Sequence, residues 1–241
     1  SNTAVGSECM YSSTSGEQNA AVGKGALYTN TTGSNNVAIG KDALYLNTTG
    51  STNIAVGRSA LAQNTTASNN VAIGDNSLNA NTTGGENTAV GTQALQNAVT
   101  DDANTAIGYR ALESANGAGY CTAVGSRSLE DTTTGDNNTA VGYNALHANT
   151  EGTNSVAVGY GALTAQTTGG INAAVGYQAM AACTTGYYSV AVGAYAGDNM
   201  TTGHSNTYIG DNAGNTHATG YGCVVVGRAS NTSGTAVNLE Y

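Results

Sequence analysis

The side chains best suited to acid–base, nucleophilic or metal chemistry are few in this sequence, and they form no cluster. Acidic pairs such as Asp101-Asp102 and Glu130-Asp131 fall where turns are expected. Phosphate loops, nucleophile elbows, Cys-x-x-Cys and Gly-Gly-x-Gly-x-Asp phrases do not occur. The sequence therefore predicts no catalytic residue, no metal and no cofactor, and we expect a protein that is not an enzyme. The histidines fall at three unrelated positions: His147, His204 and His217.

Two recurring series of side chains could instead contact a ligand. Exposed tyrosines in a row can stack on sugar rings, although they can equally serve only to cover the backbone beneath them. The tyrosines of this series are Tyr109, Tyr143, Tyr160 and Tyr177. Threonines form the second series, beginning with the phrase Asn-Thr-Thr-Gly at 30–33, 47–50 and 81–84. Ladders of threonine are typical of ice-binding solenoids, but neighbouring threonines point to opposite faces of a strand, so a polar turn is the alternative interpretation.

Both series follow one repeat that runs along the whole chain. Each copy contains a glycine after Val or Ile, and consecutive glycines are 17 residues apart without insertion or deletion. This period is shorter than the roughly 20 to 50 residues of helical repeats, propeller blades or leucine-rich units. It fits one coil of a β-solenoid, in which successive turns stack at about 4.8 Å. The fourteen glycines are Gly6, Gly23, Gly40, Gly57, Gly74, Gly91, Gly108, Gly125, Gly142, Gly159, Gly176, Gly193, Gly210 and Gly227.

The composition agrees with a fold in which almost every coil is hydrogen-bonded to the coils on both sides of it. The 241 residues include 34 Gly and no Pro, and proline is excluded from strands that are paired on both sides. We therefore predict an all-β fold, a parallel β-solenoid of fourteen 17-residue coils, as a single repeat domain over 1–241. Glycine replaces leucine late in the chain, which marks 194–241 as divergent coils that cap the domain or lead to another.

Comparison of the copies predicts which columns are buried. The invariant glycine indicates positive φ or close backbone approach, and the Leu four residues later indicates an interior stack. We place the Val/Ile before the glycine inside the coil as well. Side chains alternate along a strand, so the Ala that precedes Val/Ile would then face outward. A small apolar outward column favours packing against identical chains; the alternative is a tight monomer with no room for more than Ala. The predicted trimer interface is Ala38, Ala72, Ala106, Ala140, Ala157 and Ala191.

The phrases "NSVAVG" (154–159) and "NNVAIG" (35–40) resemble the head repeats of trimeric autotransporter adhesins. The longer phrase "NTAVGYNAL…NTTG" is similar to the fibre repeats of phage tail-fibre proteins. The resemblance covers essentially the whole chain, and it implies a left-handed β-roll with three chains side by side. Adhesin heads repeat at about 14 residues rather than 17, and no neck, stalk, anchor or chaperone domain is found here.

These observations together predict a structural and adhesive fibre segment that presents a receptor- or surface-binding face on a phage tail or a bacterial surface. The expected partners are copies of the chain itself and surface glycans. A net charge of −9 with only six Lys and Arg argues against nucleic acid, and no apolar run is long enough for membrane insertion. The rival prediction is an ice- or surface-binding monomeric solenoid that uses its threonine ladder.

The four cysteines are expected to be free, half-buried residues. Two of them share one column six coils apart, far beyond the reach of a disulfide. Free thiols favour assembly in a reducing compartment, as for a phage fibre. They are Cys9, Cys121, Cys183 and Cys223.

Overall fold

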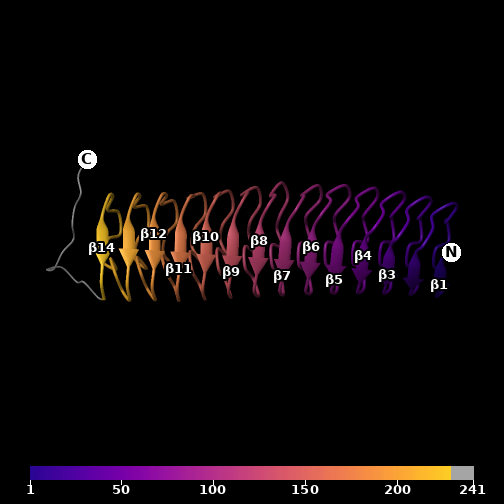
Figure 1. The fold of residues 1–241 in the computed structure, drawn as a ribbon, viewed down its shortest axis with the longest axis horizontal. Coiled ribbons are helices and arrows are strands. Elements are labelled where there is room, and N and C mark those ends of the chain that lie inside the picture. Colours follow the sequence, from indigo (N-terminus) through magenta and orange to yellow (C-terminus); the bar gives the residue numbers. More distant parts are fainter. Residues whose placement is uncertain (229–241) are drawn as a thin grey trace. The chain divides into compact units, whose positions relative to one another are not determined.

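A computed structural model describes residues 1–228 of the chain (Figure 1). The chain divides into two compact units, unit 1 (Ser1–Cys121) and unit 2 (Thr122–Tyr241). The last part of the predicted divergent region, 229–241, lies outside the described residues. Over the described range no helix is long and apolar enough to cross a membrane.

Each repeat contributes one strand of three residues, and over residues 1–228 both units consist of such strands and the turns between them. Unit 1 contains β1 (Thr3–Val5), β2 (Ala20–Val22), β3 (Val37–Ile39), β4 (Ile54–Val56), β5 (Val71–Ile73), β6 (Thr88–Val90) and β7 (Thr105–Ile107). Unit 2 contains β8 (Thr122–Val124), β9 (Thr139–Val141), β10 (Val156–Val158), β11 (Ala173–Val175), β12 (Val190–Val192), β13 (Thr207–Ile209) and β14 (Val224–Val226).

Within each unit every strand pairs in parallel with the next strand along the chain, without a shift in register. Ala21 lies opposite Ala38 and Val22 opposite Ile39, for example. Backbone hydrogen bonds also join successive coils outside the strands, as from the Leu27 N–H to the Ala43 carbonyl at 3.0 Å. The predicted all-β, parallel β-solenoid with one 17-residue coil per repeat is therefore confirmed.

The predicted orientation of the strands is wrong. The Ala at the centre of each strand points into the coil, and Ala106 and Ala140 have 0% relative exposure. The Val/Ile that follows points outward, and Ile107 is 40% exposed and Val141 37%. The Leu column is buried as predicted. The alanines predicted to form a trimer interface are covered by their own chain, so they offer no surface to another copy: Ala38, Ala72, Ala106, Ala140, Ala157 and Ala191.

The small width of the coil explains this orientation. A single coil must enclose the strand Ala together with a second alanine, a leucine and two asparagines, as with Ala38, Ala43, Leu44, Asn36 and Asn47, all fully buried. At that packing density, a side chain larger than a methyl group at the strand centre would force the coil apart unless another interior side chain were smaller. Val and Ile are instead favoured on the outer, pleated surface of the sheet, where a branched side chain fits well.

The invariant glycine combines the two properties predicted for it. Gly40 has a φ of 135°, in the region that L side chains rarely adopt. A Cβ at this position would lie 2.4 Å from the carbonyl oxygen of Gly57 in the next coil. Any other residue would therefore be strained and would push adjacent coils apart, which explains why the sequence has no exception at this position.

Buried asparagines form two ladders through the interior. In the first, Asn36 Oδ1 accepts the Asn53 N–H at 2.9 Å, and Asn36 Nδ2 donates to the Gly50 carbonyl at 2.9 Å. In the second, Asn47 Nδ2 donates to Asn30 Oδ1 at 2.7 Å and to the same Gly50 carbonyl at 2.9 Å. These side chains satisfy backbone groups that lie inside the coil away from the strands, where no sheet partner is present.

The late departures from the pattern compensate one another. Tyr208 replaces the strand alanine and is fully buried. Gly214 replaces the interior leucine of its own coil, and a Cβ there would lie 2.1 Å from the Tyr208 ring. Gly197 replaces the leucine one coil earlier, and its Cβ would lie 2.6 Å from the same ring. The tyrosine thus occupies the space that two leucines leave.

Candidate binding surfaces

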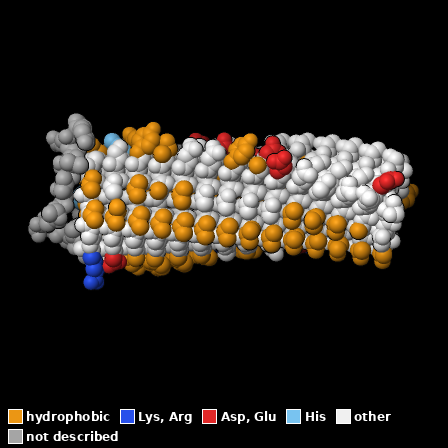
Figure 2. All heavy atoms as spheres, in the orientation of Figure 1, with side chains coloured by type: hydrophobic (Ala, Val, Ile, Leu, Met, Phe, Trp, Pro, Cys, Tyr) orange, Lys and Arg blue, Asp and Glu red, His pale blue; other side chains and the backbone are white. Residues whose placement is uncertain are grey.

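The outward face of the strands is an uncharged surface in each unit. The first and third residues of a strand point to this face, and every one of them is Thr, Ala, Val or Ile, although the chain has 21 charged residues. Exposure is substantial at both positions, as at Ile54 (39%) and Ile73 (40%) in unit 1 and Val190 (39%) in unit 2. Hydrophobic side chains gather in rows over the strands in Figure 2. We call this surface the sheet face.

Sequence reasoning assigned the sheet face to the interior and therefore missed it. One signal in the sequence identifies it. The first strand residue shares a face with the third, and it is Thr in six of the fourteen copies. The column of central residues, in contrast, never varies from Ala until Tyr208. A column that tolerates both Thr and Ile borders solvent, whereas a column restricted to one small residue is enclosed.

The predicted threonine ladder is present, but its hydroxyl groups are largely occupied. Thr31 Oγ1 donates to the Thr48 carbonyl of the next coil at 2.9 Å, and Thr48 Oγ1 donates to the Thr65 carbonyl at 2.9 Å. The second threonine of each pair, such as Thr49, points into solvent. Only one of the two adjacent threonines therefore faces outward, as the alternation of side chains requires. The same bonds recur in unit 2 at Thr133, Thr150, Thr167, Thr184 and Thr201.

The predicted tyrosine series is brought together only in part. In unit 2 the ring centroids of Tyr143 and Tyr160 are 5.3 Å apart and those of Tyr160 and Tyr177 are 5.2 Å apart, both stacked. Tyr109 belongs to unit 1, where its ring lies 5.4 Å from the Arg110 guanidinium carbon. Because stacked rings cover one another's faces, the series presents ring edges to solvent. Glycan contact at these four tyrosines stays a prediction.

Two further aromatic stacks occur at other positions of the repeat. In unit 1 the rings of Tyr11 and Tyr28 are 5.2 Å apart, and those of Tyr28 and Tyr45 are 4.9 Å apart. In unit 2 His204 lies between Tyr187 and Tyr221, at 4.8 and 5.5 Å. The unit 1 stack ends after Tyr45, because the next coil has an alanine in that column.

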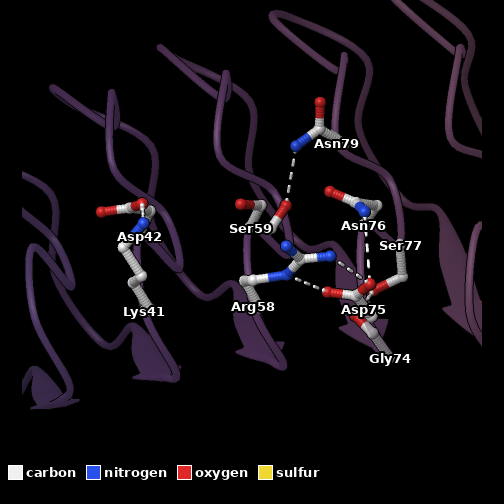
Figure 3. A network of polar contacts seen from close by, with 9 residues as sticks. All are labelled: Lys41, Asp42, Arg58, Ser59, Gly74, Asp75, Asn76, Ser77 and Asn79. Carbon is white, nitrogen blue, oxygen red and sulfur yellow. Dashed lines mark hydrogen bonds and ion pairs between the residues drawn. The ribbon is translucent and has the colours of Figure 1, made fainter.

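Charged side chains of unit 1 form ion pairs (Figure 3). Arg58 Nε and Nη2 donate to the two carboxylate oxygens of Asp75, each at 2.7 Å. The hydrogen bonds from Arg58 hold the pKa of the Asp75 carboxyl below its usual value. In the coil that precedes Arg58, Lys41 Nζ lies 3.1 Å from the neighbouring Asp42 Oδ2. These cations are thus neutralised by neighbouring carboxylates rather than forming a basic patch.

The histidines are separate from one another in the structure. His147 Nε2 lies 3.1 Å from Glu130 Oε2, His204 belongs to the stack described above, and His217 lies parallel to the Tyr208 ring at 6.1 Å. Across residues 1–228 no group of three or more His, Cys, Asp or Glu is placed to hold a metal ion.

All four cysteines are free, as predicted. Cys9 and Cys223 are half-buried, whereas Cys121 and Cys183 are fully buried. Burial raises the pKa of the Cys183 thiol to about 11.

Comparison of the chain with protein-family models, with curated proteins and with solved structures finds no match.

Proposed function

We propose that the chain is a structural and adhesive fibre segment whose copies associate side by side through the sheet face. The observation that carries this proposal is the uncharged outward face of the strands, with seven adjacent Val or Ile residues in each unit. Soluble monomers rarely expose contiguous apolar patches larger than a few hundred Å². Symmetric association of identical chains is the most common way to bury such a surface.

The interface differs from the one expected from the sequence. The branched Val and Ile side chains of the sheet face replace the alanines as the contact surface. Three chains is the number that the resemblance to trimeric fibre repeats implies. Such a segment would serve at the surface of a virion or a bacterium, where the assembled coils hold ligand-contacting side chains away from the particle.

The oligomeric state in solution tests the proposal. Light scattering of the purified chain is expected to give about three times its mass of 23.8 kDa. Replacing Val90 and Ile107 by Lys puts two charges on the sheet face of adjacent coils and should yield a folded monomer. The matched control replaces Thr83 and Thr100 by Lys. Both are exposed residues of adjacent coils outside the strands, and this variant should keep the mass of the unaltered protein. An unaltered chain that is monomeric at millimolar concentration would contradict the proposal.

A second function is favoured by the regularity of the same face. Thr and Val or Ile recur on it at one coil spacing, as in Thr88 with Val90 and Thr105 with Ile107. A regular, uncharged array of threonine and branched apolar residues could bind an ordered surface such as ice, provided that the chain is monomeric and the face is free. The two proposals exclude each other on this surface. Thermal hysteresis in the unaltered chain, lost in the Val90→Lys and Ile107→Lys variant, would favour the second.

A further inference from the structure

Unit 1 contains an unfilled position in its tyrosine stack. Tyr11, Tyr28 and Tyr45 occupy one column of the repeat in three successive coils, and Ala62 occupies the same column in the fourth. The rings of Tyr28 and Tyr45 stack at 4.9 Å, so one face of Tyr45 is covered. Next to Tyr45 and Ala62 lies an open hollow of about 480 Å³.

Side chains of this column lean back over the preceding coil. The Tyr45 ring lies over Gly25, since a Cβ at Gly25 would be 3.2 Å from two ring carbons. Asn79 reaches back in the same way and donates from Nδ2 to the Ser59 carbonyl at 2.9 Å (Figure 3). Both pairs are 20 residues apart. A side chain at 62 would by the same rule lie over Asp42, but Ala62 is too short to do so.

We call the space over Asp42, which a ring at position 62 would fill, the slot. Tyr45 and Ala62 line the hollow here, together with Asp42 and its ion-pair partner Lys41. The other lining residues are Leu46, Ser59 and Gln63 and, from earlier coils, Glu8 and Lys24.

The lining indicates the class of ligand. An apolar ring face beside carboxylate, ammonium, hydroxyl and amide groups matches a pyranose, which has one face of C–H groups and a rim of hydroxyls. The charges of the hollow balance, because Lys24 and Lys41 are accompanied by Glu8 and Asp42. This balance favours a neutral sugar over an acidic or basic one.

We propose that the slot beside Tyr45 binds a neutral pyranose, with the sugar ring in the place of a fourth stacked tyrosine. This inference takes its biological meaning from the proposed adhesive function, but its residues are distinct from those of the sheet face. For an open site that contacts a single sugar, the expected dissociation constant is on the order of millimolar.

Saturation-transfer NMR with methyl glucoside, methyl galactoside, methyl mannoside and N-acetylglucosamine, together with protein chemical shifts, tests the slot. At least one sugar is expected to shift the Ala62 methyl resonance in a saturable manner. Ala62→Tyr should fill the slot, keep the fold and weaken binding at least tenfold. The matched control is Ala181→Tyr, which adds a tyrosine to the same column in unit 2 and should leave binding unchanged.

Two outcomes would overturn the inference: no saturable shift at Ala62 with any of the four sugars at 50 mM, or equal binding by the unaltered chain and Ala62→Tyr. A stability measurement on Ala62→Tyr accompanies the titration, so that loss of fold is not mistaken for loss of binding. The Val90→Lys and Ile107→Lys variant should still bind the sugar. Failure of self-association and failure of sugar binding are therefore separately observable.

Discussion

Replacement of one asparagine in the interior ladder should destabilise the coil far more than its size suggests. Asn53 is fully buried. Its Oδ1 accepts the Asn70 N–H at 3.0 Å, and its Nδ2 donates to the Ala67 carbonyl at 2.8 Å. Asn53→Ala would leave the Asn70 N–H without a partner, whereas the Ala67 carbonyl would keep its bond from Asn64 Nδ2 at 3.1 Å. A buried polar group that loses its partner costs about 1–3 kcal/mol and a lost hydrogen bond about 0.5–1.5 kcal/mol, so the expected loss in free energy of unfolding is about 1.5–4.5 kcal/mol.

Two further variants make the result specific to the hydrogen bonds. Asn53→Ser should have an intermediate effect, because Ser155 occupies the same column in unit 2 and still accepts the Asn172 N–H at 3.3 Å. Asn97→Ala serves as the control, since Asn97 is exposed and such surface changes usually alter stability by less than about 0.5 kcal/mol.

Urea unfolding followed by circular dichroism measures the three free energies, and amide hydrogen exchange at Asn70 shows whether the loss is local. The expected order of destabilisation is Asn53→Ala, then Asn53→Ser, then Asn97→Ala. If Asn53→Ala unfolds at the same urea concentration as Asn97→Ala, the ladder does not stabilise the coil and the reasoning is wrong.

Three other predictions follow from the interior. Ala140→Glu should prevent folding of its coil because it buries a charge, whereas Val141→Glu should fold normally; circular dichroism decides, and equal melting temperatures would contradict the assignment of the two faces. Gly214→Leu should destabilise unit 2 by clashing with Tyr208, and adding Tyr208→Ala should restore stability. A double variant with a lower melting temperature than Gly214→Leu alone would count against this compensation. Because burial raises the pKa of Cys183 to about 11, its alkylation at pH 8 should be slow and should accelerate about tenfold per pH unit up to that pKa; mass spectrometry would reveal a rate independent of pH if this is incorrect.

The period, the fold class and the leucine column could be predicted from the sequence because each depends on one repeated constraint. A fixed step of 17 residues leaves no room for insertions, and the glycine at Gly40 and its equivalents is needed for both φ and close approach. The orientation of the strand could not be predicted in the same way. Ala and Val are both apolar, so alternation placed them on opposite faces without indicating which face was inside. The polar Thr105, which lies on the same face as Ile107, indicates that this face borders solvent.

The proposed slot beside Tyr45 was beyond sequence reasoning for a different reason. Its position depends on side chains that lean back by one coil, so that Ala62 leaves space over Asp42 rather than beside its own neighbours. Alanine also occurs in this column at Ala181, where no preceding tyrosine provides a wall. Neither residue type nor column alone therefore identifies the slot; the order Tyr28, Tyr45, Ala62 along the stack does.

Assembly and sugar binding would support one another physically. A single slot of millimolar affinity holds a sugar for too short a time to attach a particle to a surface. Association through the sheet face would leave the slot residues free, because Asp42, Tyr45 and Ala62 belong to other columns than Ile54 and Ile73. Each assembled particle would then carry several slots. Once the first is occupied, the others bind at a high effective concentration, and overall affinity can rise by about 10² to 10⁴. If the chain self-associates as proposed, a weak site repeated on each copy would thus suffice for adhesion, whereas the same site on a monomer would not.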